Sequence, residues 1–312
     1  MSRDPLLLPF DPLRSAIGDY LGALESEGKS AKTLRNYGDV LGRFRAFAGA
    51  VAPEAIDAAL LRRWLRALAE EGLTGTTQHT YLTRVKSWLR WLEAEECYGV
   101  DAAFLRRVKP PRLDTEQPDP FTDEEVARLL RACAPSTWTG QRLRAIIALL
   151  LDTAIRESEL CGLRLADVDL ERGEINVRAE TSKSRRTRSI TLGARAKREM
   201  GRWWRQKRSK WDPRPDAAWF LGWNERPIQP RTLHRLLTRH GDRAGVSHAH
   251  PHRFRHTAAI WAIRAGMNPL AVMHMLGHTD LAMTKRYIKL ANADVSAEKR
   301  AKSPLDHYKG RF

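Results

Sequence analysis

The segment KPPRLDTEQPDPFTDEEVARLL, residues 109–130, divides the chain into two parts. Its first half, residues 109–120, holds four prolines and no apolar periodicity, which is typical of an extended linker between domains. Its second half predicts a new helix, because Thr122 can cap the backbone and Glu125 follows at the spacing of a capping box. We therefore expect a first domain over 1–108, a linker over 109–120 and a second domain that starts at residue 121.

Upstream of this segment, apolar residues recur at the spacing of helices that bury one face. Ser30 is a suitable N-cap, and Gly28 and Gly72 stand where helices would end. The pattern predicts a bundle of four helices, over 13–27, from Ser30 to Phe47, over 55–70 and over 76–96.

Downstream, helical patterns dominate, and two short β-like runs, Glu174–Arg178 and Thr187–Leu192, flank a polar turn. The chain is therefore predicted to be mainly α with a small β-sheet. A helical first domain would precede an α+β second domain over 121–290 and a tail over 291–312. The predicted helices of the second domain cover 123–133, 139–151, 194–210, 230–242, 252–265, 268–276 and 280–290.

The net charge of +17 is concentrated in the second part of the chain. Residues 1–110 hold 16 basic and 14 acidic side chains, a net of +2, which leaves 38 basic and 23 acidic, a net of +15, for residues 111–312. The expected partner is a polyanion, and double-stranded DNA is favoured over a membrane because no basic amphipathic anchor stands out. A basic protein without such a partner is the alternative.

Several other classes of protein are not expected. No run approaches the ~18 apolar residues of a membrane span, and the apolar run in MSRDPLLLPF is too short for a signal peptide. Cys97, Cys133 and Cys161 are scattered and odd in number, so a disulfide framework is not predicted. We expect a cytoplasmic protein that associates with the nucleoid.

Four motifs in the second part carry side chains suited to phosphoryl chemistry. They are TAIRESEL with Arg156, TSKSRRTRS with Lys183, HPHRFRHT with His252 and Arg255, and LGHTDLAMTKRY with His278 and Tyr287. Each residue alone has a common structural use, such as a surface ion pair, a solvated lysine or a half-buried tyrosine. Only the combination indicates a reaction.

The combination supplies every group that a transfer of a DNA phosphoryl group requires. Two arginines can hold the non-bridging oxygens of a phosphate through bidentate hydrogen bonds. A histidine can donate to the same oxygens or move a proton, and a lysine can protonate a leaving alkoxide. A phenol, with an ordinary pKa of about 10, can attack phosphorus when cations assist it. Because arginines provide the positive charge, we expect no metal and no cofactor.

The order Arg…Lys…His-x-x-Arg…His…Tyr resembles that of the tyrosine recombinase family, which includes phage integrase, Cre and Xer-type enzymes. The resemblance covers the whole chain. It implies a four-helix core-binding (SAM-like) DNA-binding domain followed by a tyrosine recombinase catalytic domain. It also implies that Arg156 and Arg255 bind the scissile phosphate with support from His252 and His278. Tyr287 would then be the nucleophile that forms a 3′-phosphotyrosine, and Lys183 the general acid for the 5′-oxygen.

Three positions depart from the usual family pattern. Ala154 stands where glycine is usual, and we expect it to alter loop packing rather than the phosphate contact. Lys183 is flanked by serines instead of glycines, so that Arg185 and Arg186 are alternatives for the general acid. The tail resembles that of some mobile-element integrases, which leaves the choice between an Xer-like enzyme and an element integrase open.

The basic run from 183 to 210, with 12 basic side chains and one acidic, predicts contact with the DNA backbone. The predicted DNA contacts are Lys32, Arg35, Lys86, Arg90, Arg185, Arg186 and Arg188. Eight of the ten histidines lie between 234 and 278, a clustering that suggests zinc. No cysteine or carboxylate completes a ligand set, so no metal site is expected.

The leading hypothesis is a site-specific DNA recombinase that acts as a homotetramer through a Holliday junction. Its expected substrate is double-stranded DNA with short inverted-repeat core sites, with or without a second recombinase as partner. A type IB topoisomerase-like relaxing enzyme and a non-catalytic DNA-binding relic are the alternatives. The complete set of arginines, histidines and tyrosine argues against the relic.

Overall fold

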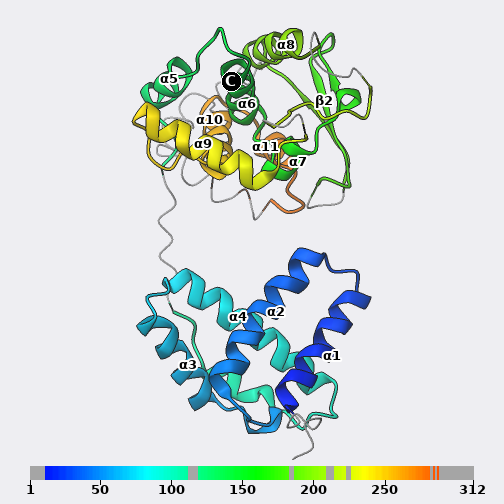
Figure 1. The fold of residues 1–312 in the computed structure, drawn as a ribbon, viewed down its shortest axis with the longest axis vertical. Coiled ribbons are helices and arrows are strands. Elements are labelled where there is room, and N and C mark those ends of the chain that lie inside the picture. Colours follow the sequence, from blue (N-terminus) through cyan, green and yellow to red (C-terminus); the bar gives the residue numbers. More distant parts are fainter. Residues whose placement is uncertain are drawn as a thin grey trace, which may run out of the picture. The chain divides into compact units, whose positions relative to one another are not determined.

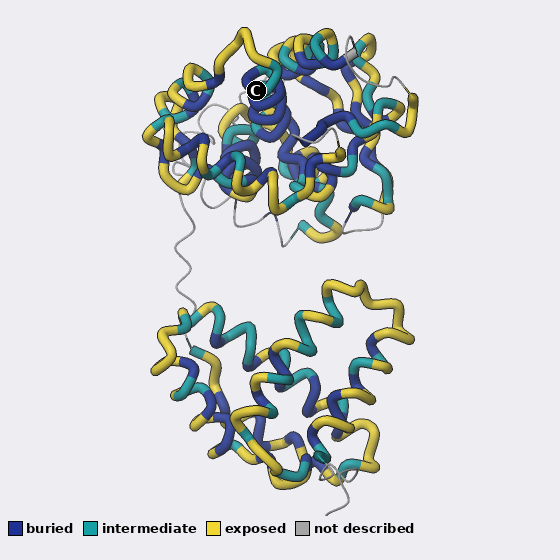
Figure 2. Tube along the Cα trace, in the orientation of Figure 1, coloured by how far each residue is buried: buried dark blue, intermediate teal, exposed yellow. Residues whose placement is uncertain are grey.

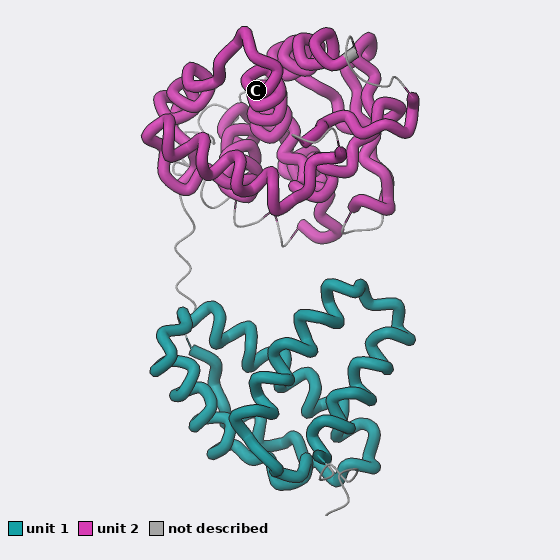
Figure 3. The backbone as a smooth tube through the Cα atoms, viewed as in Figure 1, with its two compact units in different colours: residues 1–116 teal, residues 117–312 magenta. Residues whose placement is uncertain are grey.

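The structure is a computed structural model that describes residues 11–111, 119–182, 186–208, 214–222 and 226–281, together with Thr284 and Tyr287. The chain forms two compact units, residues 1–116 and 117–312 (Figure 3). Each unit has a hydrophobic core of its own.

The first unit is a bundle of helices (Figure 1), and aromatic side chains pack at its centre. Trp64 and Trp88 are buried at its centre, and the ring of Phe44 meets both edge-on, at 5.1 and 6.1 Å. Its helices are α1 Pro12–Ser26, α2 Ala31–Ala48, α3 Ala58–Glu70 and α4 Gly75–Ala94, with short 3-10 helices η1 Pro53–Ala55 and η2 Ala102–Arg107.

Capping side chains set where these helices begin. Ser30 caps α2 as predicted, and its hydroxyl accepts a hydrogen bond from the Thr33 amide. The prediction that the third helix begins at residue 55 is wrong by three residues. Pro53–Ala55 forms a separate 3-10 turn, and the Asp57 carboxylate then caps the first turn of α3.

The second unit combines helices with a small antiparallel sheet. The Thr122–Glu125 capping box is present as predicted, and Glu125 also binds the Arg253 guanidinium at 2.9 Å. The helices are α5 Asp123–Arg131, α6 Trp138–Thr153, α7 Glu157–Cys161, α8 Ala194–Arg208, α9 Pro230–Ala244, α10 Pro251–Arg264 and α11 Pro269–Leu276, with the 3-10 helix η3 Leu165–Asp167.

The sheet has the strand order β1-β2-β3, with β1 Val168–Asp169, β2 Glu174–Val177 and β3 Arg188–Thr191. Strands β2 and β3 pair in the register that sets Val177 opposite Arg188. The alternation of the two longer strands turns Ile175, Val177 and Ile190 into the core. The sequence did not predict β1, because two residues are too few to show a period.

Helix α10 runs through the interior of the second unit and contacts α6, α9 and α11 (Figure 2). Every residue from Arg253 to Ile260 is buried, polar side chains included. Buried polar groups require hydrogen-bond partners, so this helix is where a functional site is expected.

Two further features concern the sequence predictions. The predicted helix over 280–290 lies outside the described residues apart from Thr284 and Tyr287. Within the described ranges, no helix has the length and apolar character needed to cross a membrane.

Candidate active site

Arg255 projects from the middle of α10 and is only 5% exposed. Its Nη1 donates to the Ala154 carbonyl at 2.5 Å, and its Nη2 donates to the Leu276 carbonyl at 2.7 Å. Burial, together with the positive charge of Arg156, lowers the pKa of Arg255 to about 10, which still leaves the guanidinium charged at neutral pH. The side chain is therefore a fixed cation held by neutral carbonyl groups.

Arg156, the residue directly before α7, extends its side chain to the same place. Its Nη2 donates to the Gly277 carbonyl at 2.9 Å, the carbonyl directly after the one that Arg255 uses. Both carbonyls lie at the C-terminal end of α11, where a helix leaves acceptors unsatisfied and carries partial negative charge. The two arginines thus converge on one helix end.

His278 connects Arg255 to the tyrosine. Its Nε2 lies 3.2 Å from Nη2 of Arg255, and its Nδ1 lies 2.9 Å from Oγ1 of Thr284. Because a guanidinium can only donate, Nε2 is the acceptor, and Nδ1 of the neutral ring carries the proton. The ring of Tyr287 stacks beside His278 at 6.4 Å between centroids.

Tyr287 is 1% exposed. It belongs to an apolar cluster with Ala258, Val272 and Met275, and its ring lies 5.4 Å from that of His256. The structure therefore brings Arg156, Arg255, His278 and Tyr287 to one place, with the tyrosine on the interior side.

The remaining predicted catalytic residues are His252 and Lys183. His252 lies in the first turn of α10 and is exposed, and its catalytic role stays a prediction. Lys183 and the alternative Arg185 lie outside the described residues. The alternative Arg186 is exposed.

Ala154 has a larger part in the site than its sequence position suggested. It ends α6 in the left-handed region with φ +50°, a conformation that favours glycine. That conformation presents its carbonyl to Arg255. Its backbone therefore helps to hold one of the two converging arginines, while the expectation that alanine in place of glycine alters loop packing rather than the phosphate contact stays a prediction.

Two predicted DNA contacts are engaged within the protein instead. Arg188 is buried, contrary to the prediction, because both of its terminal nitrogens bind the Glu159 carboxylate. Lys86 donates to the carbonyls of Leu105 at 2.9 Å and Val108 at 2.5 Å, which fixes the end of η2. Exposed side chains that remain predicted contacts are Lys32, Arg35, Arg90 and Arg186.

Glu159 was missed from the sequence although it is central to the site. Its carboxylate is fully buried and accepts from the Arg156 amide at 2.9 Å and from Nη1 of Arg156 at 3.0 Å. Burial alone would raise the pKa of this carboxyl, but the hydrogen bonds and charges of Arg188 and then Arg156 more than offset it and lower the pKa to about 2. Its place three residues after Arg156, as in a capping box, was the available signal.

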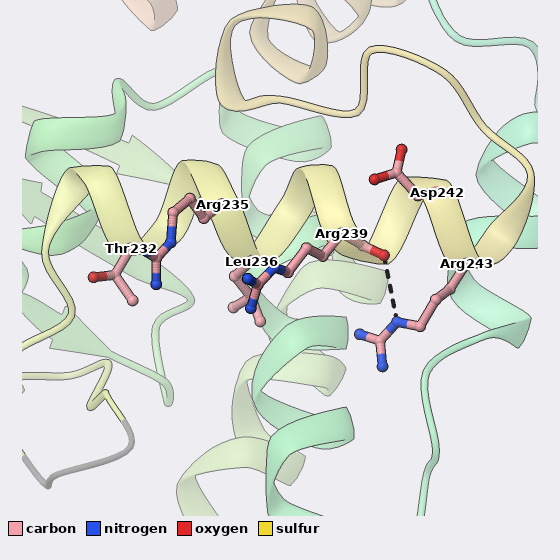
Figure 4. Close-up of a pocket in the computed structure, with 6 residues that line it drawn as sticks. All are labelled: Thr232, Arg235, Leu236, Arg239, Asp242 and Arg243. Atoms are coloured by element: carbon pink, nitrogen blue, oxygen red, sulfur yellow. Dashed lines mark hydrogen bonds between the residues drawn. The ribbon is translucent and has the colours of Figure 1, made fainter.

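A row of arginines on α9 was also missed. Arg231, Arg235, Arg239 and Arg243 are exposed and follow one another at four-residue spacing, which sets them on one helix face. Three of them line a surface pocket with Thr232, Leu236 and Asp242 (Figure 4). We call the four residues the α9 arginine row.

The fold and the site together define a class of protein in which a helical bundle precedes a mainly α domain that gathers two arginines, a histidine and a tyrosine at one helix end. Comparison with known proteins identifies the family. Residues 120–294 match the phage integrase family, and residues 17–96 match the N-terminal SAM-like domain of phage integrases. The chain therefore belongs to the phage integrase family, the family of the tyrosine site-specific recombinases.

Individual relatives agree with this assignment. Tyrosine recombinase XerA of Thermococcus onnurineus is 30% identical over 285 residues, which cover 90% of this chain and 92% of XerA. The Tn1549 transposon integrase, solved with transposon right end DNA, has the same fold, with a TM-score of 0.73 and 21% identity over 92% of this chain and 99% of that one. The lambda integrase tetramer bound to a Holliday junction gives a TM-score of 0.70 at 19% identity, over 88% of this chain and 76% of that one.

Proposed function

We propose that this recombinase cleaves and rejoins DNA through a 3′-phosphotyrosine formed by Tyr287. The phenolic oxygen bonds to phosphorus as the bond to the 5′-oxygen breaks. A histidine, His278 beside the tyrosine or His252, takes the phenolic proton, and Lys183 gives a proton to the departing 5′-oxygen. Attack by a 5′-hydroxyl of the partner strand reverses the step and restores the tyrosine.

The convergence of Arg156 and Arg255 on consecutive carbonyls is the observation that supports this proposal most strongly. Among the described residues, Arg156 donates one side-chain bond to Glu159 and one to Gly277. A guanidinium has five N–H donors, so several remain for the oxygens of a phosphate. Pre-positioned cations of this kind stabilise the charge that develops on phosphorus in the transition state.

The α9 arginine row supports DNA as the substrate and extends the expected interface. Exposed arginines at regular spacing suit the phosphates of a duplex, since backbone contacts come mainly from arginine and lysine. Together with Lys32, Arg35, Arg90, Arg185 and Arg186, the row forms our proposed DNA-binding set. No base-specific reading is assigned to it.

We further propose that strand exchange proceeds through a Holliday junction in a homotetramer on short inverted-repeat sites. The likeness in fold to a lambda integrase tetramer bound to a Holliday junction supports this assembly. Pairing with a second recombinase is the variant of this arrangement that the same chemistry allows. The expected place of action is the nucleoid in the cytoplasm.

The test is a suicide-substrate assay with nicked duplexes that carry inverted repeats, run with wild type and Tyr287→Phe. We expect a denaturation-resistant protein–DNA adduct with wild type, and mass spectrometry should locate a nucleotide on Tyr287. Tyr287→Phe should bind the same DNA and form no adduct. An adduct made by the mutant, or on another residue, would refute the nucleophile assignment.

A further inference from the structure

A buried ion pair joins strand β3 to the active site. Nη1 of Arg188 donates to Oε1 of Glu159 at 2.9 Å, and Nη2 donates to Oε2 at 2.7 Å. The Arg188 side chain is 5% exposed and that of Glu159 is not exposed at all. The contact is thus the parallel two-bond arrangement that arginine forms with carboxylates, shielded from water.

Arg188 depends on this one partner. Within the described ranges Glu159 is its only acceptor, and the remaining Nε is buried without one. A buried cation with a single neutralising group is strongly destabilised when that group is lost. Arg188 and the Glu159 carboxylate therefore stabilise each other in the buried interior.

The pair limits how Glu159 can bind Arg156. Both carboxylate oxygens are occupied by Arg188, and Arg156 makes one side-chain bond to Oε1 at 3.0 Å. Without Arg188 the same carboxylate could take the Arg156 side chain in the two-bond arrangement, while Oε2 also accepts from the Arg156 amide at 2.9 Å. That contact would use the donors, and cancel the charge, that the phosphate requires.

The geometry around Gly277 shows how closely the groups are assembled. A Cβ atom at this position would lie 2.9 Å from Cζ of Arg188 and 3.1 Å from Nη1 of Arg156. The two guanidinium groups therefore pass over a residue without a side chain. Arg188 is also the first residue of β3, five residues after Lys183 in the sequence.

We propose that Arg188 is a positioning residue, which occupies the Glu159 carboxylate so that Arg156 stays available to the scissile phosphate. This inference rests on the proposed function. It replaces the DNA contact that the sequence predicted for Arg188. Arg188 itself touches neither the substrate nor the reacting atoms.

The experiment compares Arg188→Gln, Glu159→Gln and the double variant, with Arg172→Gln as control. Arg172 is 78% exposed and belongs to the turn between β1 and β2, so that the control removes the same charge near the same sheet. For each protein we would measure the rate constant of adduct formation on a suicide substrate, the DNA dissociation constant and the melting temperature. Adduct formation by wild type and the control tests the proposed function separately.

We expect Arg188→Gln to form the adduct about 10- to 100-fold more slowly, while the DNA dissociation constant changes less than about twofold. The double variant should recover at least about fivefold of the rate, because Glu159→Gln removes the charge that captures Arg156. A double variant that forms the adduct no faster than Arg188→Gln would overturn the proposal. So would an Arg188→Gln variant with a larger DNA dissociation constant and the wild-type rate of adduct formation. If Arg188→Gln does not fold, Arg188→Lys provides the test, since its rate should fall between those of wild type and the folded double variant.

Discussion

Arg255 in helix α10 and Arg156, the N-cap residue before helix α7, donate hydrogen bonds to the consecutive carbonyls of Leu276 and Gly277 at 2.7 and 2.9 Å. One helix end therefore sets the separation of the two cations. Side chains fixed in this way need little reorganisation when a phosphate arrives, which is the condition for strong electrostatic stabilisation of a transition state.

The planar guanidinium geometry of Arg255 should matter more for the reaction rate than its positive charge. Arg255→Lys keeps a cation but cannot donate to the carbonyls of Ala154 and Leu276 in the same geometry. We expect the rate of adduct formation to fall by about 10²–10³-fold with DNA affinity nearly unchanged. Arg264→Lys, an exposed position on the same helix, is the control and should keep the wild-type rate. A wild-type rate in Arg255→Lys would show that charge alone suffices.

Gly277→Ala should impair the reaction beyond its effect on stability. Gly277 has φ +60°, and an added Cβ would meet the Arg188 and Arg156 guanidinium groups. Gly245→Ala is a matched control, because Gly245 also ends a helix at φ +64° and a Cβ added there would have nothing within 4 Å. Thermal unfolding should show a similar loss of about 1–2 kcal/mol for both. Only Gly277→Ala should slow adduct formation, and equal rates in the two variants would contradict this.

The stability that Glu159 contributes should depend on pH. Its carboxyl pKa is about 2 in the folded chain, below the ordinary value of 4.5. A depressed folded-state pKa gives stability that is present above the ordinary value and is lost as the pH falls toward 2. The gap in unfolding free energy between wild type and Glu159→Gln should therefore shrink by about 3 kcal/mol between pH 7 and pH 2.

Denaturant unfolding across that range measures the gap. Glu180→Gln is the control, because Glu180 also pairs with an arginine, Arg178 at 2.9 Å, but its side chain is 78% exposed. An exposed pair of this kind should contribute little at any pH. A Glu159→Gln gap that stays constant on acidification would show that the buried carboxylate is not the ionised group.

The α9 arginine row should govern the salt dependence of DNA binding. Each phosphate neutralised by an arginine adds about 0.9 to the slope of log affinity against log salt concentration. Replacing Arg235 and Arg239 by glutamine should therefore make the salt dependence less steep, reducing the magnitude of the slope by about 2. The control double variant, Arg172→Gln with Arg264→Gln, removes the same charge from exposed positions outside the row. Equal slopes in the two double variants would exclude the row from the interface.

The parts predicted well from the sequence are those that local patterns determine. Apolar periodicity and capping residues such as Ser30 and Thr122 predicted the helices to within a few residues. Motif order predicted which arginines, histidine and tyrosine would meet. The partners of Arg188 and Lys86 could not be predicted, because Glu159 and the η2 carbonyls reach them only through tertiary packing. Arg188 was therefore predicted to be exposed because it lies in a basic run, although it is buried.

The burial of Tyr287 bears on what the enzyme does when it is idle. A phenol that is 1% exposed among apolar neighbours is out of reach of any phosphodiester that collides with the surface. Under the proposed function, DNA cleavage therefore requires a rearrangement that exposes this side chain, so the conformation described here is inactive.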